Sequence, residues 1–258
     1  MRLATFASLL LFILLTPARA QTDKEGPKAN LDTPEAVLEA HLEATGGADA
    51  WAAVQSRRDT GERIMDGFMN QKMTSRFVTT TRYPGYLHQT QATATPNGTM
   101  DVTVIQTPEG GWADTPMGRQ DFPEGSRPPI TTPKAELTLL NDAEASLTLD
   151  LGTYEETPAY VVTVRRDTSD ARRWYDRESL LLIAAETATP DGMTLSTMAD
   201  YRDVDGLLVP FEEEQEVFIR VVMGSPDSEP QVHKVSTEVT YEQIEFNVDV
   251  DDALFADG

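Results

Sequence analysis

The chain has 258 residues, of which 40% are hydrophobic, and a formal net charge of −22 at pH 7. A surface this acidic repels nucleic acid at long range, so the composition predicts no nucleic-acid partner. The sequence contains no cysteine, which excludes disulfides, thiol catalysis, cysteine–metal sites and the lipid-modified cysteine of a lipoprotein.

Residues 1–20 have the pattern of an export signal. Arg2 supplies the positive start, an apolar run over 9–16 is too short to span a bilayer, and Ala18-Arg19-Ala20 fits a cleavage site. We therefore expect cleavage after Ala20, a periplasmic location and no transmembrane anchor. A polar, flexible leader over 21–32 and one domain over 33–258 would follow.

Two short helices are predicted to open the domain. Thr33 suits an N-cap and Pro34 the first helical position, and apolar residues follow at helical spacing until Gly46-Gly47 ends the helix. A second helix carries Trp51. We expect Leu38 and Trp51 to pack this helical pair against a sheet.

From Arg57 onward the pattern is one of strands. Short runs of β-branched and aromatic residues alternate with turn clusters, apart from a proline-rich stretch over 113–133 that reads as irregular and a helix over 133–145. Along the last long run the facing parity switches after Tyr241, which predicts a β-bulge near Glu242-Gln243. The order of elements indicates an α+β fold with a large antiparallel sheet. Because several strands are apolar on both faces, we expect the sheet to curve toward a barrel with helices over its concave face.

Motifs that would carry catalysis or bind metal are incomplete. Asp59-Thr60-Gly61 matches an aspartic-protease triplet, but no second triplet is present. Asp203-Val204-Asp205-Gly206 with Glu212 resembles part of a calcium loop, although Tyr201 occupies the first ligand position, and a tight hairpin turn explains the Asp-Gly pair better. The three histidines are far apart. We therefore predict no catalytic residues, no metal site and no cofactor, and keep a secreted hydrolase only as an alternative.

Three segments together resemble one family. They are the helical opening from Ala36 to Ser56, the stretch from Trp174 through Asp205-Gly206 to Pro210-Phe211, and the close from Ile244 to Phe255. In order and spacing they are similar to the periplasmic proteins related to the outer-membrane lipoprotein carriers, the LolA/LolB-like or lipoprotein-sorting superfamily.

The resemblance implies an unclosed, half β-barrel of about eleven strands, with helices covering the concave face. Its cavity would hold acyl chains of a lipid or lipoprotein, whose transfer from water is favourable by about 0.8 kcal/mol per CH₂. The carrier also has an arginine that helps to hold the helical lid, and the sequence does not single out one of its 16 arginines for that role.

We expect the cavity to be lined by large apolar residues of the irregular and strand regions. The candidates are Trp112, Met117, Phe122, Leu139, Leu140, Met193 and Met198. The function predicted is a carrier or binder of lipid or lipoprotein acyl chains in the cell envelope. The alternative is an envelope protein that uses the same scaffold to bind a protein partner or to sense the state of the envelope.

The basic residues are mostly arginine, and only five of the 21 are lysine. An acidic, lysine-poor exported protein suggests a salt-rich habitat, since counterions would screen the repulsion among 43 acidic residues. Salt is therefore expected to stabilise the fold.

Overall fold

The computed structural model describes residues 31–68, 71–95, 98–122, 134–167, 169–189, 192–221 and 231–256. The predicted export signal and the leader up to residue 30 lie outside this part of the chain. The described residues fall in the compact unit Leu31–Gly258.

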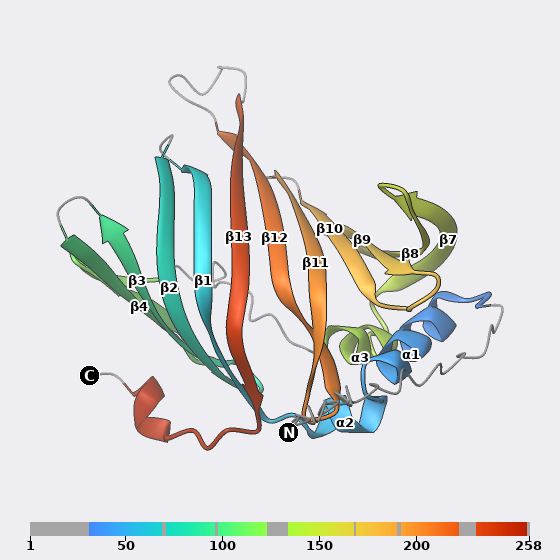
Figure 1. Cartoon of the computed structure of the whole chain (residues 1–258), viewed down its shortest axis with the longest axis horizontal. Helices are drawn as coiled ribbons and strands as arrows, with labels where there is room; N and C mark the ends of the chain where they lie inside the picture. The colour runs from blue at the N-terminus through green and yellow to red at the C-terminus, as the bar shows by residue number, and fades with distance from the viewer. Residues whose placement is uncertain are drawn as a thin grey trace, which may run out of the picture. The chain divides into compact units, whose positions relative to one another are not determined.

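Thirteen antiparallel strands form one sheet in the described part of the chain, in the order β6-β5-β4-β3-β2-β1-β13-β12-β11-β10-β9-β8-β7. The strands are β1 (Ser56–Phe68), β2 (Gln71–Arg82), β3 (Tyr86–Thr95), β4 (Gly98–Gln106), β5 (Gly111–Thr115), β6 (Gly118–Asp121), β7 (Ser146–Tyr154), β8 (Thr157–Arg166), β9 (Ser169–Asp176), β10 (Leu182–Thr189), β11 (Gly192–Val204), β12 (Leu207–Val221) and β13 (Gln231–Phe246). Every neighbouring pair is consecutive in the chain except β1 and β13, so the first and last strands meet at the middle (Figure 1). The edges are β6 and β7, which do not pair with each other, and the sheet remains unclosed as predicted.

The predicted β-bulge is confirmed where β1 meets β13. Thr60 pairs with Gln243 and Gly61 pairs with Tyr241, so Glu242 is the extra residue. A Cβ on Gly61 would lie 2.3 Å from the Thr240 carbonyl oxygen, so the close approach of the two strands requires glycine.

The helices are α1 (Pro34–Ala44), α2 (Ala48–Ala53), α3 (Ala135–Leu140) and the 3₁₀ helix η1 (Asp252–Phe255). The Thr33 hydroxyl accepts a hydrogen bond from the Ala36 amide at 3.2 Å, and Gly46 and Gly47 follow α1 with φ of +124° and +96°. These features confirm the predicted start and stop of the first helix.

Two predicted segments differ from the structure. The helix expected over 133–145 is only α3, because the Asn141 side-chain amide donates to the Leu137 carbonyl at 2.7 Å and the chain then turns. The start of the expected irregular stretch is the β5–β6 hairpin, turned at Gly118, where φ is +105°. The proline in this segment, Pro116, favoured the prediction of an irregular stretch over that of a hairpin. Residues 123–133 of the same predicted stretch lie outside the described residues.

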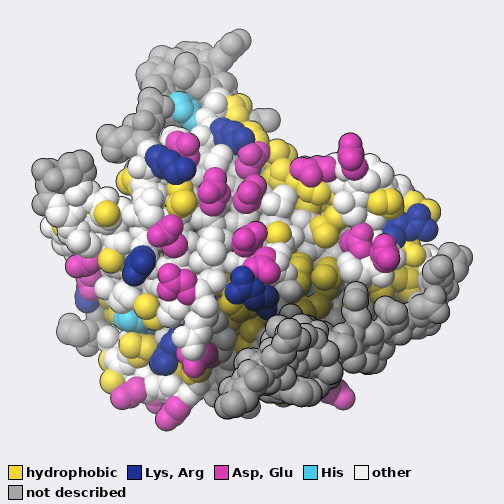
Figure 2. Space-filling view, viewed as in Figure 1, with side chains coloured by type: hydrophobic (Ala, Val, Ile, Leu, Met, Phe, Trp, Pro, Cys, Tyr) yellow, Lys and Arg dark blue, Asp and Glu magenta, His cyan; other side chains and the backbone are white. Residues whose placement is uncertain are grey.

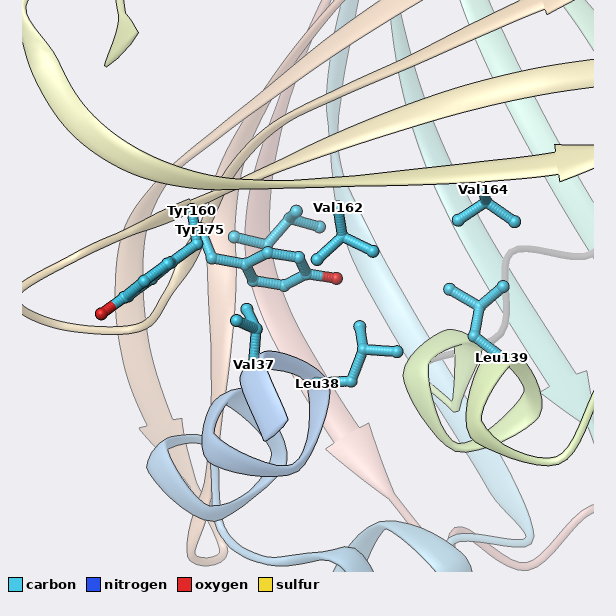
Figure 3. Packing of buried hydrophobic residues seen from close by; sticks show 8 residues of the cluster. Val37, Leu38, Leu139, Tyr160, Val162, Val164 and Tyr175 are labelled. Atoms are coloured by element: carbon cyan, nitrogen blue, oxygen red, sulfur yellow. The ribbon is translucent and has the colours of Figure 1, made fainter. Parts of the chain in front are cut away.

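The inner face of the sheet is the face against which α1, α2 and α3 pack, and two apolar clusters form there. The first cluster joins α1 and α3 to β8, β9 and β10 through Val37, Leu38, Leu139, Tyr160, Val162, Val164, Tyr175 and Leu182 (Figure 3). The second joins α1 and α2 to β12 and β13 through Leu42, Trp51, Val54, Leu207, Val209, Phe211, Ile244 and Phe246. Leu38 and Trp51 thus pack the helices on the sheet as predicted.

The opposite, outer face is rich in acidic side chains. Figure 2 shows many of them on the side that presents β12 and β13 to the viewer. Glu214 and Glu238 are exposed and lie directly opposite each other on these two strands. Among the described residues, no helix is long and apolar enough to cross a membrane.

Candidate functional site

A cavity of about 620 Å³ lies on the inner face of the sheet. Strands β1 to β4 and β9 to β13 contribute to its lining, together with α1, α2 and α3. On β1 the lining residues Arg57, Asp59 and Arg63 alternate with residues of the outer face. The helices that complete the two apolar clusters therefore also close one side of the cavity.

Part of the lining is apolar. Phe77, Leu87, Val104 and Phe122 come from the half of the sheet that leads to β6, while Leu42, Trp51, Leu182 and Met198 come from the helices and from β10 and β11. A cavity of this size with large apolar side chains falls within the range of small-molecule sites.

The rest of the lining is polar and carries charges. Arg57 and Asp59 lie two residues apart on β1 and form an ion pair, with Nε and Oδ1 2.6 Å apart and side chains 15% and 11% exposed. The Arg57 guanidinium also lies over the ring of Tyr241, 5.6 Å from its centroid. Burial raises the pKa of the Asp59 carboxyl, and the Arg57 guanidinium opposes this shift.

This pairing bears on the aspartic-protease motif. The partner of Asp59 is an arginine, whereas the protease mechanism needs two carboxyls that share a proton. Asp205 and Gly206 form the predicted hairpin turn between β11 and β12, both with positive φ, which is the geometry of a tight two-residue turn. Among the described residues, no group of three or more histidine or acidic residues could hold a metal ion.

Arg63 of β1 and Glu213 of β12 are two further charged residues of the sheet that line the cavity. Arg63 Nη1 donates to the Gln91 Oε1 at 3.2 Å, and its guanidinium lies 5.1 Å from the centre of the Phe77 ring. Glu213 Oε2 accepts a long hydrogen bond, 3.5 Å, from the Tyr241 hydroxyl. Burial lowers the pKa of Arg63 and raises that of Glu213, so the surroundings disfavour both charged forms.

Tyrosine hydroxyls add polar atoms to the same lining. The Tyr201 hydroxyl donates to the Leu182 carbonyl at 2.6 Å. The buried Tyr83 hydroxyl has no hydrogen-bond partner among the described residues. Because a buried hydroxyl without a partner is costly, Tyr83 marks a position where a bound molecule can supply one.

A buried network holds α3 beside the cavity. Glu136 of α3 accepts from Arg173 Nη1 at 2.7 Å and from the Tyr175 hydroxyl at 3.2 Å, and only 5% of Glu136 is exposed. The His41 ring packs on Tyr175 with centroids 5.1 Å apart, and its Nδ1 lies 2.8 Å from the Leu180 carbonyl oxygen. Arg173 thus holds α3 against the sheet through Glu136, a role that the sequence alone did not assign to it.

The sequence-predicted cavity residues separate into three groups. Phe122 and Met198 line the cavity. Leu139 and Leu140 pack in the apolar clusters, and Leu140 contacts both, so a charge at Leu140 would disturb the packing of α3 as well as any ligand.

The remaining three candidates lie away from the cavity. Met117 is 87% exposed at the tip of the β5–β6 hairpin. Trp112 pairs with Ile105 on the outer face, under the Arg119 guanidinium. Met193 has the opposite parity to Ser196 and Met198 of the same strand, so its side chain faces outward.

Sequence reasoning missed the polar residues of the lining. Arg57, Asp59 and Arg63 share a strand parity, which is a visible signal, but surface residues of a half-buried strand show the same alternation. Their burial depends on β2, β12 and β13 curving around them. The burial of these side chains is therefore visible only in the three-dimensional structure, where β1 lies between β2 and β13.

Neither the protein-family models nor the curated protein sequences contain a match to this chain. Solved structures do match it. A DUF1329 family protein from Desulfovibrio piger is 12% identical with a TM-score of 0.55, and the match covers 86% of this chain and 96% of that one.

Two further structures carry descriptions related to lipoprotein sorting. A putative outer membrane lipoprotein-sorting protein domain from Vibrio parahaemolyticus is 11% identical with a TM-score of 0.52, covering 86% of this chain and 95% of that one. A LolA superfamily protein from Nitrosomonas europaea is 10% identical with a TM-score of 0.53, covering 87% and 98%. Identities this low establish the fold alone. The predicted resemblance is confirmed at that level: the chain has a LolA-like fold, a large unclosed antiparallel sheet with short helices on its inner face.

Proposed function

We propose that this protein is a non-enzymatic carrier or binder of lipid or lipoprotein acyl chains in the periplasm. The observation that supports this function most is the cavity of about 620 Å³ on the inner face of a LolA-like sheet. The descriptions of two similar structures, a lipoprotein-sorting domain and a LolA superfamily protein, point in the same direction.

The physical reason is that an acyl chain crossing an aqueous compartment must be shielded from water. Phe77, Leu87 and Phe122 offer apolar surface on one side of the cavity and Trp51 and Met198 on the other. The unclosed edge between β6 and β7 leaves the sheet free of the ring of hydrogen bonds that would hold a closed barrel rigid.

The test is to purify the exported protein from its native envelope, extract it with organic solvent and identify the lipids by mass spectrometry. We expect lipid at a fixed molar ratio, and we expect the delipidated protein to bind a fluorescent fatty-acyl probe at micromolar concentration. If neither experiment detects an acyl ligand, the carrier function is wrong, and the scaffold is better explained by binding of a protein partner.

A further inference from the structure

The charges in the cavity are not equally compensated. Arg57 is paired with Asp59, and Arg173 is paired with Glu136. Within the described part of the chain, no carboxylate lies within ion-pair distance of the Arg63 guanidinium, which donates to the Gln91 side-chain amide and lies over the Phe77 ring. A guanidinium carries five N–H donors, so most of the hydrogen-bonding capacity of Arg63 remains for a ligand.

The carboxylate of Glu213 does not form an ion pair with Arg63. Arg63 and Glu213 both lie in register with Val239 of β13, so one whole strand separates their backbones. At about 4.8 Å per strand spacing, their Cα atoms are about 10 Å apart. Burial raises the pKa of the Glu213 carboxyl, and the guanidinium groups of Arg57 and Arg63 oppose this shift from a distance, without a direct ion pair to Arg63.

Other groups around Arg63 complete a polar end of the cavity. Gln89 of β3 and Gln215 of β12 line it, whereas Tyr83, whose buried hydroxyl has no partner among the described residues, lies at the other end of β1, next to Gln55. Leu87, Val104 and Phe122 continue the lining with apolar side chains. The cavity therefore has a cationic, hydrogen-bonding part and an apolar part, as a molecule with a charged head and a hydrocarbon chain requires.

We propose that the cargo is an amphiphile with an anionic headgroup, a carboxylate or a phosphate, and that Arg63 binds this headgroup while the acyl chain lies against Leu87, Val104 and Phe122. The inference rests on the proposed carrier function and adds the chemistry of the head. A buried cation is costly without an anion, and guanidinium pairs with carboxylate and phosphate through two parallel hydrogen bonds. The acidic outer face repels such a ligand only at long range, where salt screens it.

The experiment compares three ligands of one chain length on the delipidated full mature protein: dodecanoate, dodecyl phosphate and the uncharged dodecanol, each displacing a fluorescent fatty-acyl probe. We expect both anions to bind at least about tenfold more tightly than the alcohol, as a hydrogen bond to a charged group allows. The stronger of the two anions identifies the headgroup.

Arg63→Met removes the charge at similar side-chain length, and Arg76→Met is the matched control, an arginine of β2 with the opposite parity to the cavity residue Phe77. We expect Arg63→Met to weaken binding of the anions by about tenfold or more and to leave dodecanol unchanged, while Arg76→Met changes neither. Arg63→Lys, which keeps the charge, should retain part of the preference.

Three outcomes would overturn the inference. Equal binding of dodecanol and the anions by the wild type, or an equal weakening of all three ligands in Arg63→Met, leaves the carrier function standing without an anionic head. If the wild type binds no amphiphile, the carrier function fails as well. Should Arg63→Met fail to fold, as circular dichroism would reveal, the ligand preferences of the wild type and of Arg63→Lys decide.

Discussion

The inner face of the sheet has two parts in which the same alternation of side chains leads to opposite results. Over β8 to β10 most inward residues are apolar, and α1 and α3 pack over Val162, Val164 and Tyr175, which are buried. Over β1 to β3 the inward residues include Arg63, Thr79 and Gln89, and a cavity lies above them. We call these the covered end and the cavity end.

The difference shows how one sheet can combine stability with binding. Apolar inward residues draw helices onto the sheet, because burying them removes apolar surface from water. Polar inward residues cannot be covered in this way without losing their hydrogen bonds, so the space above them remains for a ligand. Stability is therefore expected to depend on the covered end and binding on the cavity end.

The largest expected effect is a difference in the free energy of unfolding that is lost when one leucine is shortened at each end. Leu38→Ala removes a fully buried side chain from the covered end and should reduce the free energy of unfolding by about 3–5 kcal/mol. Leu87→Ala, in the lining of the cavity, has fewer packed neighbours to lose and should cost about 1 kcal/mol. Urea unfolding of both variants measures this difference. Equal losses would contradict the division of the inner face.

The next effect concerns the buried pair that holds α3. Glu136→Gln leaves the Arg173 guanidinium without its carboxylate and should destabilise by about 2 kcal/mol. Combining it with Arg173→Met removes the unpaired charge and should restore part of the loss. Asp142→Asn, at the more exposed pair with Arg166, serves as the control and should cost less. A double variant less stable than either single variant would argue against a coupled pair.

A smaller effect should appear as a dependence on pH. Burial lowers the pKa of His41 below the ordinary 6.5, so the unfolded chain takes up the proton first as the pH falls. The neutral form of His41 thus stabilises the folded state above pH 6.5, and this contribution is lost as the pH falls toward the folded-state pKa. His41→Gln can keep a donor toward the Leu180 carbonyl, and its melting temperature should fall less between pH 7.5 and pH 5.5 than that of the wild type. Parallel curves would exclude His41 as the titrating group.

The smallest effect belongs to the outer face. Glu214 and Glu238 are directly opposed on β12 and β13, and like charges in this position repel. Glu238→Gln should stabilise the protein by about 0.5 kcal/mol at low salt, with the gain disappearing in molar sodium chloride. The wild type should melt at a higher temperature in high salt. A gain that persists in high salt would point to a cause other than charge.

Local patterns in the sequence predicted much of the fold. The Thr33 cap, the glycines after α1, the Asp205-Gly206 turn and the bulge at Glu242 are each set by a few neighbouring residues, and all are present. The β5–β6 hairpin was missed because Pro116 in its turn and the further prolines after Phe122 resemble the composition of a loop.

The residues of the candidate site were much harder to predict from the sequence than the fold was. Apolar residues of a core and of a cavity have the same composition, so Leu139 and Phe122 looked alike although one packs in a cluster and the other lines the cavity. Met193 and Met198 differ only in strand parity, which the register with β12 decides. The buried charges depend on strands far apart in the chain, since β1 lies beside β13.

Met193 and Met198 provide the most direct test of the central claim, that the cavity end of the inner face binds an acyl chain. Met198→Trp fills the cavity from β11, whereas Met193→Trp adds the same bulk to the outer face of the same strand. Titration of a fluorescent fatty-acyl probe against both variants and the wild type should show binding lost or weakened at least about tenfold in Met198→Trp alone, a change of about 1.4 kcal/mol. Equal binding by the two variants, or its equal loss, would contradict the claim.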